Sequence, residues 1–132
     1  MTPPDALPPA PDRTIPQSAG SVRRDALRAD LRFRLLRTLD TTPNLSQRGL
    51  AEAIGVSLGA ANAVLNAMIE AGLVQIAGTT AARSQFRISY APSDAGRAEA
   101  RRLRAPYLAR RRAERAALDA EIAALEAEGP DM

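Results

Sequence analysis

The chain has 132 residues, enough for one compact domain with extensions. It has no Cys and no His, which excludes disulfides, thiol chemistry, the usual zinc sites and the commonest general base. All 18 basic residues are Arg and the net charge is +3, so a polyanionic partner is favoured and the distribution of charge matters more than its sum. Because no carboxylate pair has a spacing typical of acid–base catalysis, we expect a protein that is not an enzyme and that needs neither cofactor nor metal.

Residues 1–20 form the first segment. They contain six of the ten prolines and almost nothing to bury, which predicts a disordered proline-rich arm. No secretion signal begins the chain, and no apolar run approaches the roughly 20 residues of a membrane span. The sequence therefore predicts a cytoplasmic protein without a membrane partner.

A first helix is predicted over residues 22–40. Leucines recur every four residues on one face and are expected to face the core, namely Leu27, Leu31, Leu35 and Leu39. Phe33 lies off this stripe and is available to pack on another helix. Most arginines of this helix are expected in solvent, and a minority on DNA phosphates or a partner subunit.

Residues 46–71 have the pattern of a helix-turn-helix. Gly55 falls where a first helix must end with positive φ, and Ser57 is placed to cap a second. The inner face of the second helix is filled at helical spacing by Ala61, Val64, Leu65 and Met68. An ordinary helical hairpin is the alternative, but the offsets favour DNA binding.

A β-hairpin is predicted next, with strands at residues 73–76 and 85–90 and a loop at 77–84. This hairpin corresponds to the wing of a winged-helix domain. Arg83 and Arg87 are its charges. An Arg at a wing tip suits a narrow minor groove, and a solubilising loop residue is an equally open interpretation.

The last helix is expected from Ser93, as N-cap, to about Glu128, with a kink or restart at Pro106. Its first half is basic and its second half acidic, which suits antiparallel pairing with a second copy. Apolar residues of this helix form the candidate dimer contacts, namely Leu103, Tyr107, Leu108, Leu118, Ile122 and Leu125. The alternative is a single helix packed on its own domain.

Several runs resemble the MarR-type regulators associated with exopolysaccharide loci. They lie at residues 31–37, 43–48, 55–59, 65–72 and 118–122, and the similarity spans about residues 27–126. Its most specific part is Ser57-Leu58-Gly59 followed by Asn62. The resemblance implies a winged helix-turn-helix transcription regulator that acts as a homodimer on operator DNA. It also implies that residues 57–71 are the recognition helix, that Asn62 faces bases or backbone, and that Arg83 is the wing arginine.

The sequence departs from this family at functional positions. Gly49 stands where a Glu would complete a capping box with Ser46. Ala60, Ala63 and Asn66 replace basic or aromatic residues, so the recognition helix has no positive charge. The acidic neighbours of the wing arginine are replaced by Ala81 and Ser84, and Pro106 interrupts a helix that is unbroken in relatives.

The predicted fold is mainly α, a three-helix core with a two-stranded wing and a long C-terminal helix. It divides into an arm (1–20), a DNA-binding domain (21–92), a dimerisation helix (93–128) and a tail (129–132). The candidate DNA contacts are Gln47, Arg48, Ser57, Leu58, Asn62, Asn66, Arg83 and Arg87. Arginines would hold phosphates, while Ser57 and the asparagines would face an A·T-leaning half-site. A protein-interaction module that has lost specific DNA binding is the alternative.

Overall fold

The computed structural model describes residues 19–82 and 85–130, with side chains omitted over residues 79–87. Its elements follow the order α1 (Ala19–Thr41), α2 (Gln47–Ile54), α3 (Leu58–Glu70), β1 (Val74–Ala82), β2 (Gln85–Pro92) and α4 (Asp94–Glu128). This is a winged helix-turn-helix fold with a long C-terminal helix, as predicted. The expected arm at residues 1–20 lies outside the described residues, except that Ala19 and Gly20 already belong to α1.

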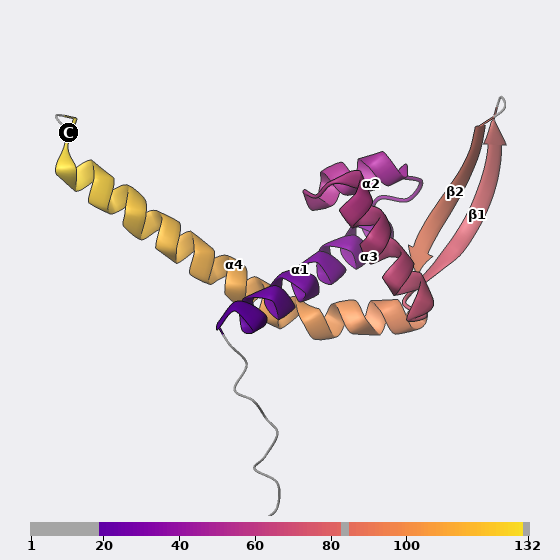
Figure 1. The fold of residues 1–132 in the computed structure, drawn as a ribbon, viewed down its shortest axis with the longest axis horizontal. Coiled ribbons are helices and arrows are strands. Elements are labelled where there is room, and N and C mark those ends of the chain that lie inside the picture. The colour runs from indigo at the N-terminus through magenta and orange to yellow at the C-terminus, as the bar shows by residue number, and fades with distance from the viewer. Residues whose placement is uncertain (1–18, 83–84, 131–132) are drawn as a thin grey trace, which may run out of the picture.

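The core is an aliphatic cluster at the junction of α1, α2, α3 and β1. Leu35 and Leu36 of α1 are completely buried, and Ile54 and Leu65 bring in the two helices of the helix-turn-helix. Figure 1 shows α2 and α3 on one side of α1, and the start of α4 on the other. Phe33 is buried and contacts α4, which confirms the expectation that it packs on another helix.

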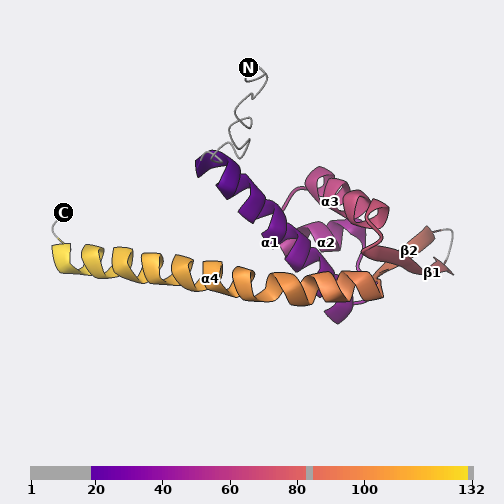
Figure 2. The same ribbon diagram turned by 90° about the horizontal axis from the view of Figure 1, so that it is seen from below.

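The N-terminal half of α1 departs from the prediction. Leu27 is 58% exposed and Leu31 is only half-buried, although both lie on the leucine stripe. Figure 2 shows the reason, because this half of α1 extends beyond the helices and strands that cover its other end. Periodicity identifies an apolar face but does not show where the neighbouring elements end.

The wing is longer than predicted. Residues 77–82 were expected in a loop, but β1 continues through them and pairs antiparallel with β2 from Val74↔Pro92 to Ala82↔Gln85. The register shifts between Ile76 and Gly78, which leaves Ala77 as the extra residue of a β-bulge. Backbone pairing with β2 overrides the small, polar composition of this segment, and threonine is itself compatible with a strand.

α4 begins and ends where it was expected. Ser93 is the N-cap, with its Oγ accepting from the Gly96 N–H at 3.1 Å, and the helix runs to Glu128. The helix does not restart at Pro106 but continues through it. It does change direction in Figure 1 where it passes α1. From residue 111 to 130 every residue of this segment is exposed.

Candidate DNA-contacting surface

The helix-turn-helix is shaped by three local interactions. The Ser46 Oγ accepts from the Gly49 N–H at 3.0 Å and starts α2, even though Gly49 cannot supply the second bond of a capping box. Gly55 then ends α2 with φ 75°, a conformation that glycine adopts without strain. Ser57 Oγ accepts from the Ala60 N–H at 3.1 Å and starts α3, so α3 leaves α2 at a bend of 99°. These interactions confirm the predicted turn glycine and capping serine.

α3 has one buried and one open face. Ala61, Leu65 and Met68 are buried, as expected, and Val64 packs partly against them. The opposite face exposes Ala63, Asn66 and Ala67, and Glu70 is its one ion. Ser57 and Leu58 are exposed at its N-terminal end, where Leu58 is 43% exposed. An α-helix with such a face fits a major groove.

Asn62 lies between these two faces. The residue is half-buried, and its Oδ1 is shielded from solvent without a hydrogen-bond partner. The Asn62 carbonyl is therefore not turned fully outward. The sequence analysis had expected this side chain to face outward, toward DNA. An unpaired buried acceptor costs about 1–3 kcal/mol. An apolar side chain at this position could pack in the same way without leaving an acceptor unpaired.

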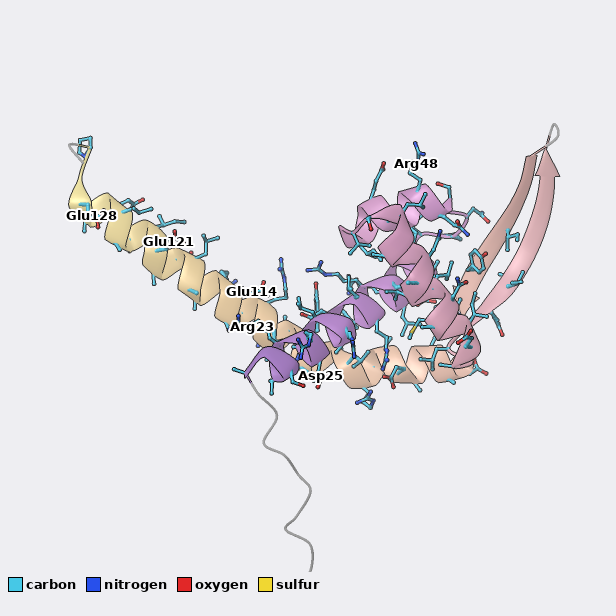
Figure 3. All side chains as sticks on the ribbon, viewed as in Figure 1. Arg23, Asp25, Arg48, Glu114, Glu121 and Glu128 are labelled. Carbon is cyan, nitrogen blue, oxygen red and sulfur yellow. The ribbon has the colours of Figure 1, made fainter. Side chains whose placement is uncertain are left out.

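The remaining candidate DNA contacts lie outside α3. Gln47 and Arg48 are exposed in the first turn of α2. Figure 3 shows Arg48 on the side of the domain away from α4. Arg87 lies in β2, paired with Thr80 through the backbone, and its side chain is outside the described part of the chain. Arg83 is likewise outside the described residues.

Several arginines serve the contact between α1 and α4 instead. The Arg110 Nε donates to Asp30 Oδ1 at 2.8 Å, and Arg97 pairs with Asp40 at 3.3 Å. Arg32 and Arg102 both reach Glu99. Hydrogen bonding to Arg102 is the main cause that lowers the pKa of Glu99, opposed in part by desolvation. The pairs that join α1 to α4 are distant in sequence, so helical periodicity could not identify which partners meet. Glu99 and Arg102 are neighbours one turn apart on α4.

The apolar residues predicted for dimerisation divide into two groups. Leu103 is buried at 5% exposure, and Tyr107 is half-buried against Phe33 of α1. Both pack within the chain, whereas the sequence analysis counted them among the candidate dimer contacts. The others are exposed by 41–55%, namely Leu108, Leu118, Ile122 and Leu125.

Within the described ranges no group of three or more Asp and Glu residues is placed to hold a metal ion. In that part of the chain no single helix is long and apolar enough to cross a membrane. The α2–α3 pair satisfies the length and composition criteria only when its two bent helices are taken together.

Comparison with known proteins agrees with this geometry. Residues 28–75 match the winged helix-turn-helix DNA-binding family, and no curated protein matches the sequence. The crystal structure of the Mycobacterium tuberculosis MarR family protein Rv2887 in complex with salicylic acid is similar. It has 31% identity over 68% of this chain and 71% of that one, with a TM-score of 0.50. The Rv2887 complex with p-aminosalicylic acid has 28% identity over 83% and 90%, with a TM-score of 0.51.

The fold and the match over α1–α3 define a winged helix-turn-helix DNA-binding protein. The similarity to Rv2887 then identifies the family. The chain belongs to the MarR family of transcriptional regulators.

Proposed function

We propose that this MarR-family regulator acts as a homodimer that reads a specific operator with α3, with exopolysaccharide or cell-surface genes among its targets. The observation that carries the proposal is the open face of α3, on which Asn66 and Ala63 are exposed. Figure 1 shows α3 between the wing and α2, the helix that contains Arg48. The gene assignment rests on the resemblance of the sequence runs alone.

Affinity and base recognition are assigned to different residues. Arg48, Arg83 and Arg87 would neutralise phosphates and so make binding dependent on salt. Asn66 and Asn62 can pair bidentately with adenine, and Leu58 and the exposed alanines suit thymine methyl groups. Because α3 carries no positive charge, one copy alone would bind weakly.

The distal part of α4 supports dimerisation. Leu118, Ile122 and Leu125 follow a spacing of four and three residues on one face, and each is more than 40% exposed. The acidic end of α4, where Figure 3 places Glu121 and Glu128, projects away from the domain. Antiparallel pairing would lay it on the basic half of a second copy. Two recognition helices would then reach half-sites about 34 Å apart.

Asn62 gives the proposal its sharpest test. Its unpaired Oδ1 is a cost in the free protein, which a rotamer change on DNA would remove. We expect Asn62→Ala to leave the free energy of unfolding unchanged or raised, because it removes an unsatisfied acceptor. The same variant should lose about 1–3 kcal/mol of discrimination between the selected operator and a changed site.

Arg48→Ala is the matched control. It removes a phosphate contact, so affinity should fall equally on all sequences, and the slope of log K against log salt should fall by about one. Both variants are measured by fluorescence anisotropy on duplexes selected from a random pool by the unmodified protein. Equal loss on all sequences by Asn62→Ala would contradict the assignment.

The uncharged outer face of α3 also fits a protein-interaction module, the second candidate function. The two candidate functions predict different outcomes when the unmodified protein is used to select DNA sequences. Failure of the unmodified protein to select any sequence at about 100 mM salt would favour the second candidate.

A further inference from the structure

Pro106 weakens α4 where the helix leaves the domain. Proline has no N–H to donate to the carbonyl of Arg102 and its ring crowds that carbonyl, so the helix bends more easily there. The change of direction in Figure 1 lies in this part of α4. Leu103 is buried on the near side of Pro106, whereas residues 111–130 are exposed.

Two residues of α4, Tyr107 and Arg110, contact α1 just beyond Pro106. The Tyr107 ring lies against Phe33, with centroids 4.6 Å apart and planes inclined by 37°. The Arg34 Nε donates to the Tyr107 hydroxyl at 3.1 Å. One turn further along, Arg110 donates from Nε to Asp30 Oδ1 at 2.8 Å. Together these contacts fix the direction in which the exposed part of α4 leaves the domain.

Arg34 connects the same contact to the helix-turn-helix. Its second nitrogen, Nη1, donates to the Ile54 carbonyl at 3.4 Å, in the last turn of α2 and directly before Gly55. Carbonyls at a helix C-terminus carry partial negative charge, which favours a guanidinium there. A single half-buried side chain therefore contacts both α4 and the turn that sets α3.

We infer that Arg34, Tyr107 and the Asp30–Arg110 pair are positioning residues that fix the angle between the helix-turn-helix and the distal part of α4. In the dimer they would thereby set the distance between the two recognition helices. This inference rests on the proposed function, because it takes residues 118–125 as the dimer contact.

A small change in the angle of α4 at Tyr107 displaces residues 118–125 by a larger distance, because they lie far along the helix. At 1.5 Å per residue, the seam at residues 118–125 lies about 16–27 Å along the helix from Tyr107. A change of about 10° at Tyr107 would move the seam by about 3–5 Å relative to the domain, which is about one base-pair step of 3.4 Å. A looser angle should therefore alter which half-site spacing is accepted, while each α3 keeps its own contacts.

The test uses variants that keep the apolar contacts. Tyr107→Phe removes the hydroxyl and keeps the ring, and Asp30→Asn removes the charge that holds Arg110. The double variant Asp30→Asn/Tyr107→Phe removes the Tyr107 hydroxyl and the Asp30 charge together, and Arg112→Lys is the control because Arg112 is exposed. Thermal unfolding and sedimentation equilibrium establish that each variant is folded and dimeric.

The first measurement needs no DNA. The chain has no Cys, so Glu70→Cys on α3 places one spin label in each subunit. We expect a narrow distance distribution in the parent and in Arg112→Lys, and a distribution about twice as wide in the double variant. An unchanged width in a folded, dimeric double variant overturns the inference.

The second measurement uses duplexes with two inverted copies of the selected half-site. Their centres are separated by about 8 to 13 base pairs, a range around one helical turn of ~10 base pairs. The parent should prefer one spacing. In the double variant, the ratio of affinity for that spacing to affinity for the others should fall about fivefold, while the affinity for a single half-site stays unchanged. A retained preference, or equal loss on single half-sites, overturns the inference and leaves the proposed function standing. A parent that is monomeric or selects no sequence overturns both.

Discussion

The two ends of α4 belong to one continuous helix but have opposite surroundings. Near its start, Gly96 and Leu103 are buried against the rest of the domain. Beyond residue 110 the helix is exposed throughout, and the side chains of Leu118, Ile122 and Leu125 are 44–55% exposed. The first part is specified by contacts inside the domain, whereas the second has an exposed apolar face, which is the face proposed to pair with a second copy.

The largest effect is expected at the packed end. A Cβ on Gly96 would lie 2.0 Å from the Leu73 carbonyl oxygen, so α4 could not approach β1 without a backbone shift. Gly96→Ala should therefore lower the free energy of unfolding by about 3 kcal/mol or more, measured by urea denaturation. Gly59→Ala is the control, because a Cβ there meets nothing within 4 Å and should add up to about 1 kcal/mol of helix stability. Equal stability of the two variants would contradict this account.

The next effect is expected at the exposed end. Ile122→Glu places a charge on the apolar face of both copies, so the dimer dissociation constant should rise at least about 100-fold in sedimentation equilibrium. Ala120→Glu adds the same charge on the opposite side of the helix and should change association far less. Because neither residue contacts the domain, thermal unfolding of the monomer should be the same for both. If the two variants associate equally, the face is not the dimer contact.

The smallest effect is expected at the ion pairs that Glu99, in the packed part of α4, makes with Arg32 and Arg102. Hydrogen bonding to Arg102 lowers the pKa of Glu99 in the folded chain, so this carboxylate stabilises the fold above its unfolded pKa. That contribution is lost as pH falls through the lowered folded pKa. Glu99→Gln should thus lower the Tm by about 2–4 °C at pH 7, with a difference that shrinks toward pH 3. Glu121→Gln, on the exposed part of α4, should show no such difference at either pH.

Local signals explain why much of the fold could be predicted from the sequence. Gly55, Ser57 and Ser93 act through the backbone of their own neighbours, so their roles follow from position alone. The helical spacing of Leu65 and Met68 similarly identified the buried face of α3.

The rest depends on contacts between distant residues. The leucine stripe does not show that α1 extends beyond the elements packed against it, which leaves Leu27 exposed. The sequence around Tyr107 does not indicate that this side chain contacts Arg34. The extension of β1 also required its partner strand. For the DNA surface, the sequence predicted the open face of α3 but not the half-buried position of Asn62, which depends on how closely the neighbouring side chains pack.

Ser93 has a consequence for how this protein can be divided. Its N–H donates to the Leu73 carbonyl at 3.0 Å and its Oγ donates to the Gly72 carbonyl at 2.6 Å, while the same Oγ caps α4. One residue thus joins the exit of α3, the base of the wing and the start of α4. A fusion of α1–α3 and the wing to the dimerisation domain of another protein must keep this chain past Leu103. A cut after Pro92 would remove α4 and expose the core residues that its first part covers.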